Sequence, residues 1–342
     1  MDNRSVPDLE TLGWDAGWKA AFETGEGMTP GRVAVQHRGA YDVLTESGER
    51  RTRVAPRVRR TSTPAELPVV GDWVAIHDDV IEAVLPRRTA FVRRAAADPG
   101  SGTAREQVVA ANVDVVFVTA ALGQPLDRLV LERYLTLALQ SGARPVILLT
   151  KADLEADPAG VAAEIEDVGG AIPIHFVSAR TGNGVERVRA LVGAGSTGAL
   201  LGPSGVGKST LVNTLVGDDA LLETGGLGAD GTGRHTTTRR QLVPIPGGGL
   251  LIDNPGMREV HLWLADEGLE AAFADIAELA ANCRFADCSH ETEPGCAVQA
   301  ALRDGTLARD RWDRYRALER ELAELSERLE RHERSRGGRA RR

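Results

Sequence analysis

The chain has 342 residues and a formal net charge of −8, with 42% hydrophobic and 26% charged residues. This length is sufficient for two or three domains with their own cores, and the acidic balance argues against a protein that coats nucleic acid over its whole surface. No apolar run approaches the roughly 18 residues of a membrane helix, so we expect a cytoplasmic protein with no membrane contact.

An N-terminal extension, residues 1–28, is predicted to carry a short helix. Trp14, Trp18 and Phe22 recur at four-residue spacing and would share one face of it. We expect this apolar face to pack on the domain that follows.

Residues 29–95 are predicted to form an OB-type β-barrel. Five strand-like runs are separated by Gly, Pro and polar turns, at 33–35, 41–44, 53–55, 72–76 and 80–85. Such barrels often bind nucleic acid, and six arginines between Arg50 and Arg60 would give this one an electropositive loop. A solvated charged loop is the alternative. The basic C-terminus, RSRGGRARR, is the second expected polyanion contact.

Residues 104–262 alternate between apolar strands and helices, which predicts a parallel, doubly wound α/β sheet. Strands are expected at 113–119, 145–149 and 172–177. Helices are expected near 128–140, 159–168 and 185–192.

A guanine-reading loop is predicted after the strand at 145–149, at the strand end where open α/β sheets bind ligands. Its sequence TKAD comprises Thr150, Lys151, Ala152 and Asp153. The Asp153 carboxylate only accepts hydrogen bonds, which suits the N1–H and N2–H₂ donors of guanine and disfavours adenine. The next strand ends in Ser178 and Ala179, whose backbone would face the guanine carbonyl. Thr150 replaces the usual Asn and lacks its amide, so a reduced affinity for guanine is one possible consequence.

A phosphate-binding loop follows, between a strand end at 199–201 and a helix that begins at Ser209. Lys208 would pair with the β- and γ-phosphates, and the Ser209 hydroxyl would ligate Mg²⁺. Of the 41 basic residues only three are Lys, and two of them lie in these nucleotide motifs. The loop consists of Gly202, Pro203, Ser204, Gly205, Val206, Gly207, Lys208, Ser209 and Thr210.

The order of the two motifs is reversed relative to an ordinary GTPase, in which the phosphate loop comes first. The guanine loop begins 52 positions before the phosphate loop in this chain, at residue 150 against residue 202. We therefore predict a circularly permuted P-loop GTPase domain.

The polar, glycine-rich stretch 224–240 is expected to be the mobile switch loop. One of its threonines at 236–238, taken here as Thr237, would complete the Mg²⁺ shell, although the choice among them stays open. Asp253, at the end of an apolar strand, would hold a Mg²⁺-bound water. Gly256 would offer its N–H to the γ-phosphate.

Hydrolysis requires a group that orients the attacking water. Met257 occupies the position where a glutamine is common, and a thioether cannot orient water. His235 is the candidate catalytic residue because its imidazole donates or accepts near neutral pH. An ordinary solvated histidine is the alternative.

Residues 263–342 are predicted to form a helical zinc-binding domain with a basic tail. All three cysteines of the chain fall in one segment, as Cys283, Cys288 and Cys296, together with His290. Three thiolates and one imidazole complete a tetrahedral structural Zn²⁺ site, and an odd number of cysteines argues against a disulfide framework. Helices are expected at 266–281 and from 307 to about 334. Leucines at 318, 322, 325 and 329 form an apolar stripe that packs on its own domain or docks on a partner.

The combination of these features resembles the small ribosomal subunit biogenesis GTPase family RsgA, also called YjeQ-like. The resemblance covers residues 30–300 and rests on the order of these features. The OB-like barrel comes first, TKAD and VSA precede GPSGVGKST, and GRHTTT, DNPG and the Cys-x4-Cys-x-His-x5-Cys spacing follow. Departures are Thr150, and Asn254 where Thr or Ser is common. The resemblance implies hydrolysis of GTP to GDP and phosphate during late 30S maturation, stimulated by the small subunit. It also implies 16S rRNA binding and release after hydrolysis; we expect a monomer.

Three other functions are weighed against this one. A nucleotide-gated rRNA-binding module with negligible turnover is kept open by Met257. A permuted GTPase of the large subunit is disfavoured by the barrel and by the C-terminal position of the cysteines. An ATP-dependent small-molecule kinase is disfavoured by Asp153 and the Ser178-Ala179 pair.

Overall fold

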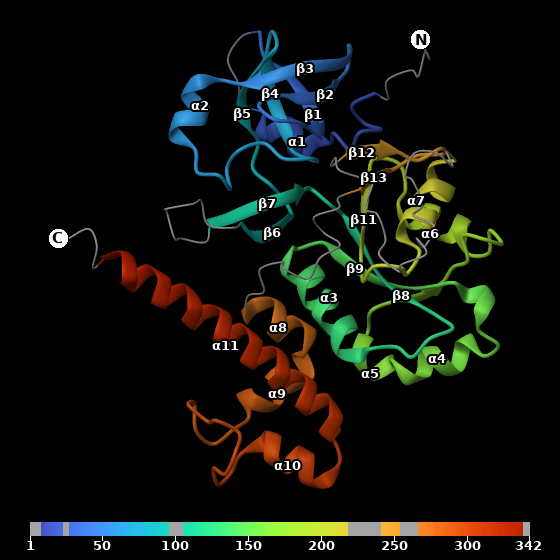
Figure 1. Cartoon of the computed structure of the whole chain (residues 1–342), viewed down its shortest axis with the longest axis vertical. Coiled ribbons are helices and arrows are strands. Elements are labelled where there is room, and N and C mark those ends of the chain that lie inside the picture. Colours follow the sequence, from blue (N-terminus) through green and yellow to red (C-terminus); the bar gives the residue numbers. More distant parts are fainter. Residues whose placement is uncertain (1–7, 23–26, 96–104, 218–240, 254–265, 338–342) are drawn as a thin grey trace, which may run out of the picture.

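The computed structural model describes residues 8–22, 27–95, 105–217, 241–253 and 266–337. Three bodies follow one another along the longest axis in Figure 1: a β-barrel, an α/β sheet, and a helical C-terminal unit. Within the described part of the chain, no helix combines the length and the apolar character that crossing a membrane requires.

The barrel closes as an OB-type barrel does. Its strand order is β1-β2-β3-β5-β4, and β4 pairs back onto β1. The side chains of Val33, Val43, Val74 and Ile81 are buried inside it. The predicted five-stranded barrel is confirmed, with strands β1 (Thr29–Gln36), β2 (Tyr41–Thr45), β3 (Gly48–Val54), β4 (Trp73–His77) and β5 (Val80–Val84).

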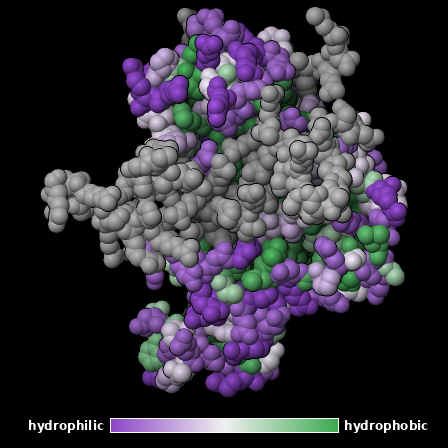
Figure 2. Space-filling model, in the orientation of Figure 1, coloured by the Kyte–Doolittle hydropathy of each residue, from purple (hydrophilic) through white to green (hydrophobic). Residues whose placement is uncertain are grey.

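The arginine cluster is not a loop, and that prediction was wrong. Its first half belongs to β3, because the pairing of that strand with β2 extends back to residue 48. Its second half forms the helix α2 (Pro56–Thr61), which begins at a proline that suits the first helical turn. Figure 2 shows a mostly hydrophilic outer face over the barrel. Three of the arginines are ion-paired, in the pairs Arg50–Asp79, Arg51–Asp42 and Arg57–Glu82.

The predicted N-terminal helix is present as α1 (Ala16–Ala21), and it packs on the barrel through aromatic rings. Asp15 caps it by accepting a hydrogen bond from the Trp18 backbone. The rings of Trp14 and Trp18 lie 4.7 and 6.2 Å from that of Trp73 in β4. Trp18 is buried in these contacts and Trp14 is half-buried.

The central sheet has the strand order β10-β9-β8-β11-β13-β12, in which only β12 runs antiparallel to its neighbour. It joins the barrel through β12 and β1, where Val35 pairs with Gln241, so one 11-stranded sheet runs through both bodies. The strands are β8 (Val115–Ala121), β9 (Arg144–Thr150), β10 (Ile174–Phe176), β11 (Thr197–Leu201), β12 (Gln241–Pro244) and β13 (Leu250–Asp253).

Helices cover both faces of this sheet because successive strand residues alternate between them. Val116 and Val118 of β8 pack in the core shared with α3, whereas Val115 and Phe117 pack in the core shared with α6 and α7. The doubly wound architecture is confirmed. The helices are α3 (Arg128–Gln140), α4 (Pro158–Glu164), α5 (Glu166–Gly169), α6 (Val185–Leu191) and α7 (Lys208–Val216).

Two local features differ from the sequence expectations. The helix expected at 159–168 is interrupted at Ile165, which separates α4 from α5. A two-stranded ribbon, β6 (Ala90–Ala95) with β7 (Arg105–Ala111), was not predicted. It lies across the predicted boundary between barrel and GTPase domain, and the predicted domain limits stay predictions.

The C-terminal unit contains four helices in its described part: α8 (Asp266–Ala272), α9 (Ala274–Ala281), α10 (Ala297–Asp304) and α11 (Arg309–Gly337). The single helix expected at 266–281 is divided at Phe273, which is fully buried against Tyr315. α10 was not predicted. Leu318 and Leu322 are buried, which agrees with a leucine stripe that packs on its own domain. The structure does not describe the side chains at positions 325 and 329.

A buried charge cluster joins α11 to α3 of the central sheet. The Glu132 carboxylate, 1% exposed, accepts hydrogen bonds from Arg311 at 2.9 Å and from Arg314 at 2.8 Å. Arg311 also forms a two-point contact with Asp275 of α9. Burial raises the pKa of Glu132, and the two guanidinium groups oppose this shift. The Glu132 carboxylate is therefore shared by two arginines of α11, and each of these also pairs with a second carboxylate, Arg311 with Asp275 and Arg314 with Asp310.

The variant Glu132→Gln is expected to lower the free energy of unfolding by about 3 kcal/mol, because two buried arginines lose a shared countercharge. Urea denaturation measures this. The matched control is Asp313→Asn, which breaks the exposed pair Arg309–Asp313 and is expected to change little. Equal stability of the two variants would contradict the role assigned to Glu132.

Candidate functional site

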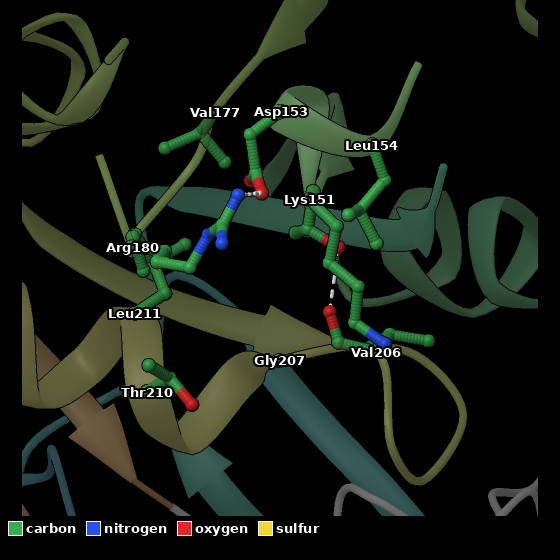
Figure 3. A pocket seen from close by; sticks show the side chains of 11 residues that line it. Lys151, Asp153, Leu154, Val177, Arg180, Val206, Gly207, Thr210 and Leu211 are labelled. Atoms are coloured by element: carbon green, nitrogen blue, oxygen red, sulfur yellow. Dashed lines mark hydrogen bonds and ion pairs between the residues drawn. The ribbon is translucent and has the colours of Figure 1, made fainter. Parts of the chain in front are cut away.

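A pocket of about 310 Å³ opens where β9, β10 and β11 end (Figure 3). Seven of the predicted nucleotide residues line it, from both the guanine loop and the phosphate loop. Apolar walls come from Leu154, Val177 and Leu211, which the sequence reasoning did not single out. The other lining residues are Thr150, Lys151, Asp153, Ala179, Arg180, Val206, Gly207 and Thr210.

The guanine loop presents its carboxylate at one end of the pocket. Lys151 adopts a left-handed conformation, with φ of 55°, and a 3-10 turn from Ala152 to Leu154 follows. The backbone N–H of Ala152 donates to the Val177 carbonyl at 3.2 Å, which joins the turn to the end of β10. Asp153 accepts a 2.5 Å hydrogen bond from the Ser178 hydroxyl, and this bond is the main reason its pKa is lowered. The carboxylate is therefore held ionised.

Thr150 fastens the guanine loop to the phosphate loop. Its hydroxyl donates to the Val206 carbonyl at 2.5 Å and lies 3.2 Å from the Ala120 carbonyl. A hydroxyl carries one hydrogen, so the shorter contact is the principal bond. The sequence shows that this position keeps a hydroxyl and loses the amide of the usual Asn. In the structure this hydroxyl links the guanine loop to the phosphate loop.

The phosphate loop runs from β11 into α7, as predicted. Gly202 lies so close to β8 that a Cβ atom there would come within 2.3 Å of the Thr119 hydroxyl oxygen. The left-handed Gly207, with φ of 96°, precedes the first helical residue, Lys208. The Lys208 ammonium is buried and donates to the carbonyls of Gly202 at 2.7 Å and Pro203 at 2.5 Å. The helix N-terminus and the ammonium thus meet at one loop, which suits anionic phosphates.

Several predicted residues lie outside the described part of the chain. These are His235, the threonines at 236–238 including Thr237, Asn254, Gly256 and Met257, together with the side chain of Asp253. The backbone of β13 is described, and its residue Ile252 pairs with Ala199 of β11. The strand that ends at Asp253 is thus the direct neighbour of the strand that enters the phosphate loop.

The predicted metal ligands converge in the C-terminal unit. The ligand atoms of Cys283, Cys288, His290 and Cys296 all lie within 4.8 Å of one another. The Cys283 and Cys296 sulfurs are 3.8 Å apart, and each is 3.5 Å from His290 Nδ1. A tetrahedral Zn²⁺ with ordinary bond lengths needs edges of about 3.8 Å between sulfurs and about 3.6 Å between sulfur and nitrogen. The cluster has the shape of a metal cage.

Backbone N–H groups surround this cluster and suit thiolate ligands. Cys296 caps α10, and its sulfur accepts from the Gln299 N–H at 3.4 Å. The Ala297 N–H lies 3.4 Å from the Cys283 sulfur. The Gln299 side chain donates to the His290 carbonyl at 2.6 Å. Such second contacts orient metal ligands and stabilise their charged form.

The comparisons with known proteins agree with this geometry. The family model described as RsgA GTPase matches residues 84–263. The small ribosomal subunit biogenesis GTPase RsgA of Opitutus terrae is 44% identical over 94% of this chain and 92% of its own length. A protein of the same name from Streptomyces coelicolor is 45% identical over 92% of this chain and 86% of its own.

Two solved structures share the fold. YjeQ from Thermotoga maritima has a TM-score of 0.65 and 28% identity, and the match covers 86% of this chain and 99% of that one. YloQ, described as a circularly permuted GTPase, has a TM-score of 0.64 at 24% identity, over 89% of this chain and 98% of that one. The predicted circular permutation is confirmed.

The variant Thr150→Val keeps the shape of the side chain and removes its hydroxyl, leaving the Val206 carbonyl without this donor. We expect guanine nucleotides to bind about tenfold more weakly, since an unmade buried hydrogen bond costs about 1–3 kcal/mol. Calorimetric titration with GDP measures this, and circular dichroism checks the fold. Thr150→Asn, which keeps a donor, is the control. Unchanged affinity in the valine variant would show that the link does not position the loop.

Proposed function

This chain belongs to the RsgA GTPase family, and we propose that it is a GTPase of small ribosomal subunit maturation. It binds GTP between the guanine loop and the phosphate loop, hydrolyses it to GDP and phosphate, and leaves the 30S particle after hydrolysis. The observation that carries the proposal is one pocket lined by both Asp153 and the phosphate loop, in a permuted sheet.

The guanine preference rests on the chemistry of the pocket. The apolar walls suit the faces of a purine, and the ionised Asp153 carboxylate accepts from the guanine edge. Adenine offers an acceptor at the corresponding ring position and is disfavoured. Thr150, Lys151 and the backbone of Ser178 and Ala179 complete the proposed base site.

The proposed hydrolytic site follows from the phosphate loop. Lys208 would exchange its bonds to Gly202 and Pro203 for phosphate oxygens. Mg²⁺, when bound, would neutralise charge on the β- and γ-phosphates, with Ser209, Thr237 and Asp253 as its proposed ligands. We keep His235 as the candidate that orients the attacking water, because Met257 cannot do so.

The proposed partner is the small ribosomal subunit, which the names of the relatives mention. The proposed contact is with its 16S rRNA. The arginines of β3 and α2 support an rRNA contact, since five of the six are exposed on an OB-type barrel. Action on ribosomal particles agrees with the cytoplasm as compartment. We keep the monomer as the proposed state.

The proposed metal is Zn²⁺, bound structurally by the three cysteines and His290. The four ligands leave no free position for substrate, and the spacing of their atoms suits this ion. The metal would hold the loop before α10 against α9.

GTP turnover should rise strongly with isolated small subunits and not with large subunits or joined ribosomes. The control is Asp153→Asn: its amide suits the xanthine edge, so turnover should move from GTP to XTP. Absence of stimulation by any particle would favour the alternative, a nucleotide-gated rRNA-binding module with negligible turnover. Stimulation by large subunits alone would contradict the proposal.

The variant Cys283→Ser is expected to lose zinc, measured by metal analysis of the purified protein, while GDP affinity stays near that of the parent. Loss of one ligand typically weakens a structural site strongly. We further expect this variant to hydrolyse GTP on the small subunit and to leave it more slowly. Ser289→Ala is the matched control in the same loop. Full zinc content in the cysteine variant would contradict the assigned ligand set.

A further inference from the structure

Arg180 is the residue of the pocket that the proposed function leaves without a role. It directly follows Ser178 and Ala179, and its guanidinium lies 2.6 Å from the second carboxylate oxygen of Asp153 (Figure 3). Ser178 holds the first oxygen at 2.5 Å. Both oxygens of the carboxylate that would read guanine therefore already have partners.

The chemistry of this contact resembles that of the expected ligand. A guanidinium presents N–H donors in a planar fork, and the guanine edge presents N1–H and N2–H₂ donors in one plane. Both suit a single carboxylate. Since the Arg180 side chain lies on the pocket wall and already pairs with the second oxygen of Asp153, it would compete with guanine for that oxygen.

The ion pair between Arg180 and Asp153 is also easy to break. The Arg180 side chain is 74% exposed, whereas that of Asp153 is 13% exposed. Among the residues that the structure describes, Asp153 is the only acidic side chain that pairs with Arg180. An ion pair with one end in solvent is weak and sensitive to salt, so displacement of the arginine costs little.

We infer that Arg180 is a specificity-determining residue that caps the empty guanine site, occupying Asp153 as a mimic of the base and yielding only to a ligand with the same donor pattern. This rests on the proposed function. Ligand binding then requires the state in which Arg180 has left Asp153. The apparent association constant is the intrinsic constant multiplied by the fraction of molecules in that state. The cap lowers GDP and GTP affinity equally, because it acts at the base and not at the phosphates.

The test compares Arg180→Ala with Arg187→Ala, an exposed arginine of α6 outside the pocket lining that matches the loss of charge. Arg180→Ala should bind GDP about threefold more tightly at low salt. Association should be faster and dissociation unchanged, as measured by stopped flow with a fluorescent GDP analogue. The gain should shrink in 0.5 M salt, roughly where the Debye length falls to a few ångströms. Guanosine, which lacks phosphate, should show the same gain in competition.

Each outcome decides between explanations. Weaker binding with faster dissociation in Arg180→Ala would overturn the inference and assign the arginine to holding the bound base. Identical behaviour of the two alanine variants would overturn it as well. Failure of the parent protein to prefer guanosine over adenosine nucleotides would instead refute the proposed function. Thermal unfolding of both variants confirms that they are folded.

Discussion

The parallel direction of the central strands is the constraint on which the nucleotide site depends. β9, β10, β11 and β13 run the same way, so their carboxyl ends lie at one edge of the sheet. The guanine loop follows β9 and the phosphate loop follows β11, with β8 between them. Strand direction and strand order bring the loops together, whichever comes first in the chain. A permuted order can therefore retain the site, and the Thr150 hydroxyl fixes the remaining distance.

The sheet also connects the site to the other two bodies. β12 pairs with β13 on one side and with barrel strand β1 on the other, so a shift of β13 has a hydrogen-bonded route into the barrel. Arg32 of β1 is buried and donates to the carbonyls of Leu12, Gly71 and Asn112. Burial lowers the pKa of Arg32 to about 10. On the opposite side, Glu132 holds α11 against α3.

The C-terminal unit has a different physical basis from the sheet. Around the cysteine cluster its helices are short, and the long α11 contributes Trp312 and Tyr315, which stack on one another and contact His290 and Phe273 respectively. A small core of this kind gains much from a bound metal, because the ion closes a loop and binds the folded chain in preference to the unfolded one. At the nucleotide pocket, the exposed Arg180 side chain pairs with Asp153 while no guanine is bound.

The sequence by itself determined the fold class, the permutation and the cluster of three cysteines and a histidine, because each depends on residue types at short spacing. Glycines and a lysine between strand and helix define a phosphate loop, and three cysteines and one histidine within fourteen positions define a candidate metal cage. It did not determine the contacts of Arg180, Thr150 or Glu132. Each meets a partner 27 to 182 residues away, and such partners become neighbours only when the sheet is assembled. The arginines of β3 were misassigned for the same reason: a polar strand is recognisable only from the strands it pairs with.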